Sequence, residues 1–287
     1  MNRLPDLLQC ADVRNHILAA MNEDIGAGDC TSLSLVDPTG LTAADILTRQ
    51  PCTVSGATVA AACFRLRDSQ MKITVGVADG NEAAPGTSLL RVQGRAQAIL
   101  EAERTALNYM QRMTGIATLT RQYVAIAKPH GVTILDTRKT TPGMRRFEKY
   151  AVLCGGGTNH RMGLYDRVLI KDNHRSLWHA GGQIRLADAI REARHRFPSL
   201  EVEIEVESIA ELTDALDGAP DWILLDNMQP EMLRRCVETT RGRCKLEVSG
   251  GVNLSTLSSF VTTGVDAVSV GALTHSVPSV DLSLEIA

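Results

Sequence analysis

Long apolar runs are missing from this sequence. No uninterrupted apolar stretch approaches the roughly 18 residues that a helix needs to span a bilayer. Charged side chains also interrupt residues 1–20, so that no apolar segment long enough for a secretory signal occurs there. We therefore expect a soluble, cytoplasmic protein that does not use a membrane as a partner.

Aromatic residues are scarce, and neither charge is in large excess. Phe, Trp and Tyr make up 3% of the chain, and 30 Lys and Arg stand against 33 Asp and Glu, for a net charge of −3. The few rings are not interleaved with basic residues, as a base-stacking surface requires. A molecule of this charge has no general attraction for nucleic acid. We therefore expect no nucleic-acid partner, and any affinity for anions must be local.

Cysteine pairs and nucleotide-binding motifs are also missing. The seven cysteines are scattered and contain no CxxC pair, which predicts reduced, mostly structural thiols in a reducing compartment. Neither a GxxxxGKS/T loop nor a GxGxxG fingerprint occurs, so a nucleoside triphosphatase or a dehydrogenase is not expected. Four histidines without a partner at metal-ligand spacing are expected at the surface or in packing: His16, His130, His179 and His195.

The first part of the chain has the pattern of a small, mostly antiparallel sheet. With 287 residues and 44% hydrophobic content, the chain can form one large barrel or two modest domains. A helix-rich start at Asp12–Met21 is followed by short alternating segments and turns. Apolar residues at helical spacing then fill Glu101–Lys128, with Gly115 as the expected break between two helices at a domain boundary. The predicted strands are Asp45–Arg49, Ser55–Gly56, Met71–Val77 and Leu89–Ala98.

Beyond residue 130, strands and helices alternate. Short apolar segments typical of buried parallel strands are separated by helical material, which favours a barrel or an open doubly wound sheet. The six predicted strands are Val132–Leu135, Val168–Ile170, Val202–Val206, Trp222–Leu225, Leu246–Val248 and Ala267–Val270. The predicted helices are Gly182–Phe197, Ile209–Leu216, Glu231–Thr239 and Leu254–Thr262.

Polar residues fall at the carboxyl ends of these strands. In a parallel α/β barrel these ends share one face, where active sites are built. The intervals from Glu205 to Asp226, to Ser249 and to Gly271 are 21, 23 and 22 residues, about one strand-plus-helix unit each. We therefore predict a barrel with one site at this face. Its candidate residues are Asp136, Arg138, Lys139, Lys171, Asp172, Asn173, Glu205, Asp226, Asn227, Ser249, Gly250, Gly251 and Gly271.

The segment Arg138–Arg175 is strongly basic. It holds nine Lys or Arg against three acids in 38 residues. A solvated basic face is one interpretation. Two features favour an anion site instead, because the basic residues flank predicted strand ends and Gly155-Gly156-Gly157 lies among them. A triple glycine lets the backbone approach a ligand closely, although by itself it also fits a simple turn.

Glycines and acids complete the predicted site. Ser249-Gly250-Gly251 and Gly271 follow late strands, where backbone amides of barrels commonly hold a phosphate, although close helix-to-strand packing is an alternative. Glu205 and Asp226 suggest a paired-acid hydrolase, but basic surroundings would keep both ionised and deprive a general acid of its proton. We favour carboxylates that hold ribose hydroxyls or a magnesium ion. The implied ligand is anionic and carries phosphates and a sugar.

Six motifs resemble one known family. They are Glu23–Asp29 (EDIGAGD), Glu103–Asn108 (ERTALN), Asp136–Gly143 (DTRKTTPG), Gly155–Arg161 (GGGTNHR), Leu169–His174 (LIKDNH) and Ser269–His275 (SVGALTH). They closely resemble the quinolinate phosphoribosyltransferases, also called carboxylating nicotinate-nucleotide pyrophosphorylases. The likeness extends over nearly the whole chain, and motifs this long and in this order are highly specific.

The resemblance implies a fold, a reaction and an assembly. The fold is an α/β sandwich at residues 1–115, completed by 276–287, and an incomplete TIM-like α/β barrel at 116–275. The reaction joins quinolinate to phosphoribosyl pyrophosphate with Mg²⁺ and gives nicotinate mononucleotide, pyrophosphate and CO₂, a step of de novo NAD biosynthesis. The assembly is a homodimer with shared active sites, in which Arg104 reaches the partner's barrel mouth, and a hexamer of dimers stays open.

The resemblance also implies residue roles by matching position. Quinolinate carboxylates are bound by Arg104, Arg138, His160 and Arg161, with Thr140 among the substrate-binding residues. The catalytic group is Lys139 and Lys171 at the pyrophosphate and reacting centre, with Glu205 and Asp226 at the ribose hydroxyls and Mg²⁺. The 5′-phosphate is held by Ser249, Gly250, Gly251, Gly271 and His275.

Two other functions remain open at this point. A sister phosphoribosyltransferase, such as the homologue associated with molybdenum transport or an enzyme using nicotinate alone, would share the fold. The intact LIKDNH string and an arginine set suited to two carboxylates argue against it. A silent anion-binding or metabolite-sensing module is the alternative from another class, and release of pyrophosphate would exclude it.

Overall fold

A computed structural model describes residues 4–178 and 185–287. The chain folds into two compact units. Unit 1 takes the chain up to Arg121, with Thr140–Gly156 and Leu273–Ala287; unit 2 comprises Gln122–Lys139 and Gly157–Ala272. The predicted domain limits at residues 115 and 116 stay a prediction. His179 and the predicted helix start at Gly182 lie outside the described residues.

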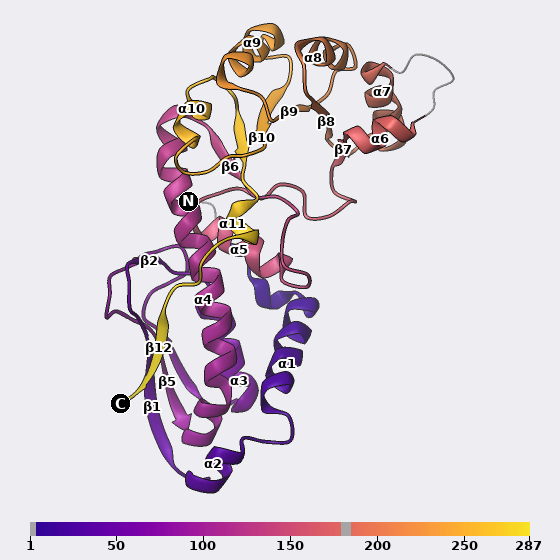
Figure 1. Ribbon diagram of the computed structural model, residues 1–287. Coiled ribbons are helices and arrows are strands. Elements are labelled where there is room, and N and C mark those ends of the chain that lie inside the picture. Colours follow the sequence, from indigo (N-terminus) through magenta and orange to yellow (C-terminus); the bar gives the residue numbers. More distant parts are fainter. Residues whose placement is uncertain (1–3, 179–184) are drawn as a thin grey trace. The chain divides into compact units, whose positions relative to one another are not determined.

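Unit 1 contains a four-stranded antiparallel sheet. Its strand order is β12-β1-β5-β3, so the last strand of the chain pairs with the first (Figure 1). In β1 the burial alternates towards its end, as expected of a sheet with one covered face. Two short strands, β2 and β4, form a separate pair. The bounds are β1 Leu41–Thr48, β2 Cys52–Thr53, β3 Lys72–Val75, β4 Glu82–Ala83, β5 Ser88–Arg95 and β12 Leu282–Ile286.

The helices of unit 1 are placed by caps and apolar stripes. Helix α1 buries Val13, Ile17 and Met21, four residues apart, which is the spacing of one helix face. Helix α2 begins because the Asp29 carboxylate accepts the N–H groups of two residues in its first turn. The bounds are η1 Leu7–Gln9, α1 Ala11–Ile25, α2 Cys30–Leu35, α3 Ala57–Arg67, α4 Ala96–Ala127, η2 Lys128–His130 and α5 Arg145–Cys154.

One predicted strand of this region is wrong. Ser55–Gly56 is not a strand, because Ser55 is held through both of its backbone groups by the Thr114 hydroxyl on α4. Gly56 has φ +93° and precedes α3, a helix that the sequence pattern did not predict. The Asp79 carboxylate accepts the N–H of Ala57 at 3.0 Å and so caps α3 from 22 residues away. A cap this distant leaves no local signal.

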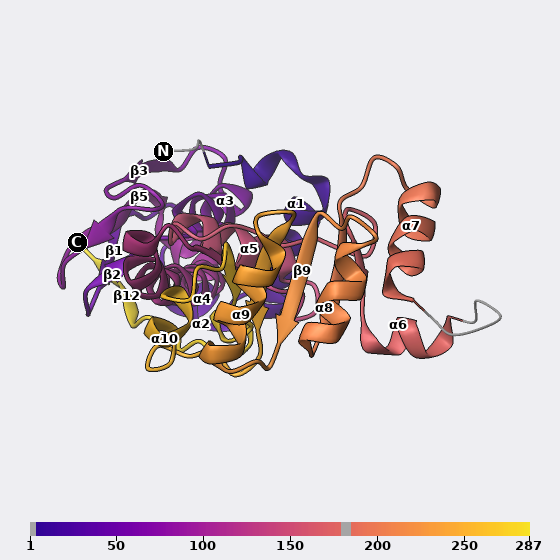
Figure 2. The ribbon, with the colours of Figure 1, turned by 90° about the horizontal axis from the view of Figure 1, so that it is seen from above.

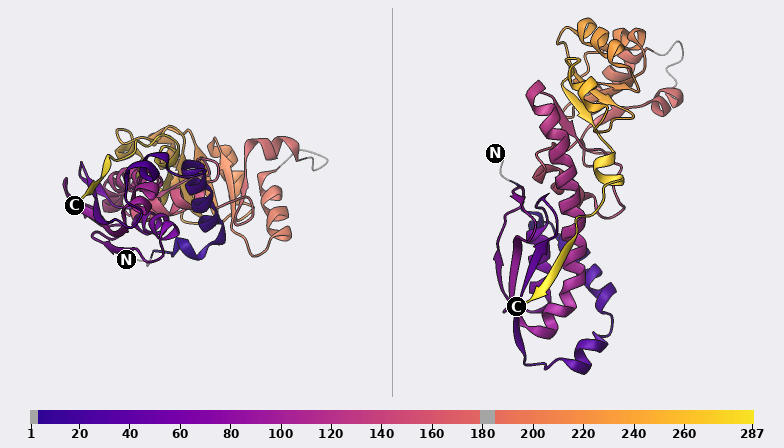
Figure 3. Two further views of the ribbon diagram at one scale, coloured as in Figure 1. Left: turned by 90° about the horizontal axis from the view of Figure 1, so that it is seen from below. Right: turned by 60° about the vertical axis from the view of Figure 1, so that its left-hand side comes forward.

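The predicted helix break at Gly115 is also wrong. Helix α4 runs without interruption from Ala96 to Ala127. The glycine serves packing instead, since a Cβ at Gly115 would lie 2.3 Å from the carbonyl oxygen of Pro278. The C-terminal segment therefore passes close along α4, where the Gln111 amide also donates to the Leu282 carbonyl at 3.0 Å (Figure 3, right).

Unit 2 is built on a six-stranded parallel sheet. Its order is β6-β11-β10-β9-β8-β7, and all six strands predicted from apolar segments are present. The last strand, β11, pairs directly with the first, β6, and Thr158 adds a parallel bridge to Leu135 on the other side of β6. The sheet thus curves into an incomplete barrel. The bounds are β6 Thr133–Leu135, β7 Val168–Ile170, β8 Val202–Val206, β9 Trp222–Asp226, β10 Lys245–Ser249 and β11 Ala267–Ser269.

Helices follow the strands of unit 2 as a parallel sheet requires. Successive helices pack against each other from α7 to α10, and Figure 2 shows α8 and α9 running alongside β9. The bounds are α6 Asp172–Leu177, α7 Leu186–Arg196, α8 Ile209–Leu216, α9 Pro230–Thr240, α10 Leu257–Val261 and α11 Ala272–His275.

Candidate active site

The carboxyl edge of the unit 2 sheet gathers most of the predicted residues. Asp136 follows β6, Lys171 follows β7, Glu205 lies near the end of β8, and Asp226 and Ser249 end β9 and β10. Ser249 is in register with Asp226 in the parallel ladder. Because parallel strands end at the same edge, these side chains share one rim.

A lysine and a group of acids form the first part of this rim. The Lys171 ammonium donates to Glu205 at 3.1 Å. Burial, and then the charge of Glu205, raise the pKa of Asp226, and these effects outweigh the opposing effect of Lys171. The basic surroundings therefore favour the ionised form of Asp226 less than expected. Glu205, Asp226 and a further acid, Glu207, each place a carboxylate oxygen within 4.8 Å of the other two.

The two glycines of the turn after β10 have different surroundings. Gly250 has φ +96°, and a Cβ there would lie 2.1 Å from the Asn227 side-chain oxygen, so this glycine is required by close packing. Gly251 has φ +62° and nothing within 4 Å of its Cβ position. Close packing, the alternative to phosphate binding in the sequence analysis, accounts for Gly250. Gly251 borders open space instead.

The basic segment divides between the two units. Arg138, Lys139, Arg161, Arg167, Lys171 and Arg175 belong to unit 2, and Arg145, Arg146 and Lys149 lie on helix α5 of unit 1. For the last three, the prediction that they flank strand ends is wrong. Close packing accounts for the first residue of the triple glycine, because a Cβ at Gly155 would lie 2.5 Å from the Thr120 Cβ on α4.

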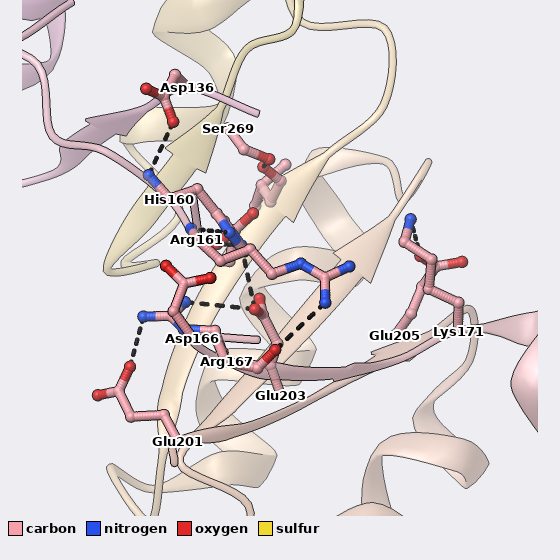
Figure 4. A network of polar contacts seen from close by, with 12 residues as sticks. Asp136, His160, Arg161, Asp166, Arg167, Lys171, Glu201, Glu203, Glu205 and Ser269 are labelled. Carbon is pink, nitrogen blue, oxygen red and sulfur yellow. Dashed lines mark hydrogen bonds and ion pairs between the residues drawn. The ribbon is translucent and has the colours of Figure 1, made fainter. Parts of the chain in front are cut away.

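Two arginines of unit 2 lie close enough to repel each other. Burial and the charge of Arg138 lower the pKa of Arg161. The Arg161 guanidinium also donates to the Arg167 carbonyl at 3.2 Å, which fixes its direction (Figure 4). Two like charges held together in a partly buried place favour an anion between or beside them.

His160 is held through its backbone N–H and both ring nitrogens. Its backbone N–H donates to the buried Asp136 carboxylate at 2.8 Å, and its Nδ1 accepts the Arg161 backbone N–H at 2.7 Å. Its Nε2 lies 3.1 Å from Glu203 on β8 (Figure 4). The same nitrogen lies 3.4 Å from Glu247 on β10. Both glutamates are buried, and the sequence reasoning missed both.

One of the missed acids, Glu203, has a signal that alternation along a strand provides. Glu203, Glu205 and Glu207 are two residues apart, with the buried Ile204 and Val206 between them. Residues two apart on a strand face the same side. A run of this kind in a buried strand predicts three acids on one face of the sheet, and of these only Glu205 was singled out.

Three predicted site residues belong to unit 1. Arg104 is exposed on α4, and the Thr140 hydroxyl accepts from the Arg145 guanidinium at 3.0 Å. His275 ends α11, and its Nδ1 lies 2.5 Å from the Ser276 hydroxyl. Lys139, in unit 2, uses its backbone N–H to donate to the Thr137 hydroxyl at 3.0 Å.

No helix within the residues 4–178 and 185–287 is long and apolar enough to cross a membrane. The described part of the chain also holds all seven cysteines, and each is a free thiol.

Known proteins resemble this chain over almost its full length. Residues 29–114 match the family described as Quinolinate phosphoribosyl transferase, N-terminal domain, and residues 116–285 match its C-terminal domain. A probable carboxylating nicotinate-nucleotide pyrophosphorylase of Bacillus subtilis is 39% identical over 97% of this chain and 94% of its own. A decarboxylating quinolinate phosphoribosyltransferase of Nicotiana glauca is 40% identical over 96% of this chain and 82% of its own.

The solved structure of the nicotinate-nucleotide pyrophosphorylase from Francisella tularensis shares the fold. It superposes with a TM-score of 0.91 at 34% identity and covers 100% of this chain and 98% of its own. This agreement confirms the predicted α/β sandwich followed by an incomplete TIM-like barrel. The matched domains and relatives together show that the chain belongs to the quinolinate phosphoribosyltransferase family.

Proposed function

We propose that this chain transfers the phosphoribosyl group of phosphoribosyl pyrophosphate to quinolinate and releases pyrophosphate and CO₂, giving nicotinate mononucleotide. One observation carries the proposal: a repelling arginine pair, a lysine and a group of acids gather in unit 2 of a chain that belongs to this enzyme family. These are the groups that a dicarboxylate, a pyrophosphate and a ribose require.

Arg138 and Arg161 bind the carboxylates of quinolinate. A guanidinium binds a carboxylate through two parallel hydrogen bonds, which sets the plane of the pyridine ring as well as its position. Burial, and then repulsion by Arg138, lower the pKa of Arg161, and a dicarboxylate placed beside the two guanidinium groups would relieve the repulsion. The ring nitrogen is then aimed at ribose C1, which lowers the entropic part of the barrier.

Lysines and acids stabilise opposite charges during the transfer. Cleavage of the bond between ribose C1 and pyrophosphate builds positive charge on the sugar and negative charge on the leaving group. Glu205 and Asp226 face the sugar, whereas Lys139 and Lys171 attract the pyrophosphate. The Lys171–Glu205 distance of 3.1 Å supports this assignment, because it puts both kinds of charge next to one reacting bond.

A magnesium ion fits the acid group. Glu205, Glu207 and Asp226 offer three carboxylate oxygens within 4.8 Å of one another, and Mg²⁺ prefers such oxygen ligands together with phosphate. The ion would neutralise charge on the pyrophosphate. Ser249, Gly250 and Gly251 with Gly271 and His275 hold the 5′-phosphate, and the open space beside Gly251 supports this part of the proposal.

Decarboxylation follows from the product of the transfer. Once the ring nitrogen is bonded to C1 it is cationic, and it accepts the electron pair that remains when the adjacent carboxylate leaves as CO₂. Exclusion of water from the carboxylate makes its loss easier. The residues of the chain orient and desolvate the ring, and the substrate supplies the electron sink.

The working unit is a homodimer in a reducing compartment such as the cytoplasm. The exposed Arg104 on α4 is available to a second copy, where it completes the quinolinate site. The seven free thiols support the compartment.

A direct assay tests the proposed function. The purified chain is given phosphoribosyl pyrophosphate, Mg²⁺ and, in separate reactions, quinolinate, nicotinate or nicotinamide, and the nucleotide, pyrophosphate and CO₂ are measured. We expect all three products in equal amounts with quinolinate only. Turnover of nicotinate in preference to quinolinate would indicate a sister enzyme instead, and no pyrophosphate with any acceptor would leave a binding module.

A further inference from the structure

We propose that Glu203 and Glu247 are positioning residues that act through His160 to hold Arg161 in place for the substrate. The proposal rests on the proposed function, since Arg161 is there assigned to quinolinate. It adds two acids to which neither the sequence motifs nor the charges at the rim give a role.

The two glutamates meet inside the barrel. They belong to β8 and β10, which are separated in the sheet by β9. Their carboxylate oxygens and a His160 nitrogen nevertheless lie within 4.8 Å of one another. Adjacent strands are about 4.8 Å apart, so side chains two strands apart converge in this way only on the inner face of a curved sheet. The relative exposure of Glu203 and Glu247 is 0% and 1%.

The hydrogen bonds of His160 determine where its proton lies. Nδ1 accepts the Arg161 backbone N–H at 2.7 Å and must therefore offer a lone pair. The proton of the neutral ring is then on Nε2, which faces Glu203 and Glu247 at 3.1 and 3.4 Å. The two carboxylates raise the pKa of His160 to about 9 although burial lowers it. The hydrogen bond from the Arg161 backbone N–H opposes protonation of the ring, because an imidazolium has no lone pair on Nδ1 to accept that N–H.

The same tautomer excludes a metal ion at this cluster. The spacing of His160, Glu203 and Glu247 would suit one. A neutral imidazole has only one lone pair, however, and Nδ1 uses it for the Arg161 N–H. Nε2 carries a proton and cannot bind a metal. Glu203 is therefore the acceptor for the ring N–H. The Glu247 carboxylate faces the same nitrogen at 3.4 Å and acts on the ring through its charge, since neither of its oxygens accepts a hydrogen bond from the described part of the chain.

Glu203 supports Arg161 by two routes. The first passes through His160 to the Arg161 backbone N–H. The second passes through Arg167, whose guanidinium lies 3.3 Å from Glu203 and whose carbonyl accepts from the Arg161 guanidinium at 3.2 Å. Glu247 uses the first route. Buried groups of this kind typically hold a binding side chain in its working orientation.

Glutamate variants with matched controls test the proposal. Glu247→Leu removes the polar group that faces the His160 ring, whereas Glu247→Gln keeps a polar oxygen there and the same volume. Glutamine suits this position because burial, and then the charge of Glu203, raise the pKa of Glu247 and favour an uncharged side chain. Glu201→Leu is the control, since Glu201 pairs with the same Arg167 at the surface and has no bond to His160.

We expect a selective effect on quinolinate. The KM for quinolinate should rise about tenfold in Glu247→Leu and more in Glu203→Leu, as for other groups that support a binding residue from behind. The KM for phosphoribosyl pyrophosphate should stay unchanged, and Glu247→Gln and Glu201→Leu should resemble the wild type. Equal rises in both KM values, or no rise in folded Glu247→Leu, would overturn the proposal.

A spectroscopic measurement separates this proposal from the proposed function and does not depend on turnover. Nitrogen-15 spectra of labelled histidine, recorded above the His160 pKa of about 9, should show the neutral ring as the Nε2–H form, and this signal should be lost in a His160→Gln variant. An Nδ1–H form at that pH would sink the positioning role even in an active enzyme. Absence of quinolinate turnover with the expected tautomer would instead count against the proposed function alone.

Discussion

At the scale of single residues, the positions of the candidate residues at the rim were easier to predict than those of the buried residues behind them. Lys171, Glu205 and Asp226 could be placed at the sheet edge from sequence because each lies at, near or just after the end of a predicted strand. Glu203 and Glu247 were missed because a buried acid looks like an exception to the apolar pattern rather than part of a site. Their partner, His160, comes from a distant stretch of chain, and no local pattern reports that contact.

The arginine pair gives the first prediction at this scale. Arg138→Ala should weaken quinolinate binding by about 1.5–3 kcal/mol for each charge-assisted hydrogen bond that is lost. Isothermal titration of the folded variant measures this. Arg243→Ala is a matched control, because Arg243 binds only backbone carbonyls at the end of α9. Unchanged affinity in Arg138→Ala would remove Arg138 from the site.

Cysteine reactivity gives a second prediction. Burial raises the pKa of both Cys63 and Cys154 to about 12, so that almost none of either is thiolate at pH 8. Cys30 is exposed. Iodoacetamide at pH 8 should therefore label Cys30 and leave the two buried thiols unmodified, as read by mass spectrometry of peptides. All three should react in urea, and rapid native labelling of Cys63 would contradict the burial of this side chain on α3.

At the scale of elements, apolar periodicity predicted strands well and helix ends less well. All six strands of the parallel sheet could be predicted from short apolar segments, although β8 and β10 each include buried glutamate. Helices α3 and α5 could not. The first is capped by Asp79 from another part of the chain, and the second lies in a basic segment whose charges conceal its buried face. Gly115 was misread because a packing glycine and a helix break have the same sequence signal.

The packing role of Gly115 can be tested with Gly115→Ala, a substitution that helix propensity alone predicts to be stabilising. Alanine is about 1 kcal/mol better than glycine inside a helix. The Pro278 carbonyl at 2.3 Å from the new Cβ should reverse this, so that Gly115→Ala lowers the free energy of unfolding by about 1–3 kcal/mol. Urea denaturation measures the change. Gln122→Ala, an exposed position of the same helix, should have little effect, and a stabilised Gly115→Ala would show that the C-terminal segment does not lie where described.

At the scale of the whole molecule, the predicted sites of unit 2 need a residue that unit 2 does not contain. Arg104 lies in unit 1, and the proposed dimer supplies it from a second copy. Fold and family are shared with proteins that match nearly all of this chain, so the sequence was sufficient for both. The assembly stays a prediction that rests on the resemblance, because an exposed arginine on a helix has no sequence signal for a partner.

Mixing two inactive variants tests the shared site. Arg104→Ala and Lys139→Ala should each abolish most activity, because the first removes a residue given to the partner and the second a residue of the chain's own barrel. In a mixed dimer, one site then has both defects and the other has none. Random exchange makes half of the dimers mixed, so the mixture should recover about one quarter of wild-type activity. Mass spectrometry of the intact dimers confirms exchange, and a mixture that stays inactive after proven exchange would mean that each barrel uses its own Arg104.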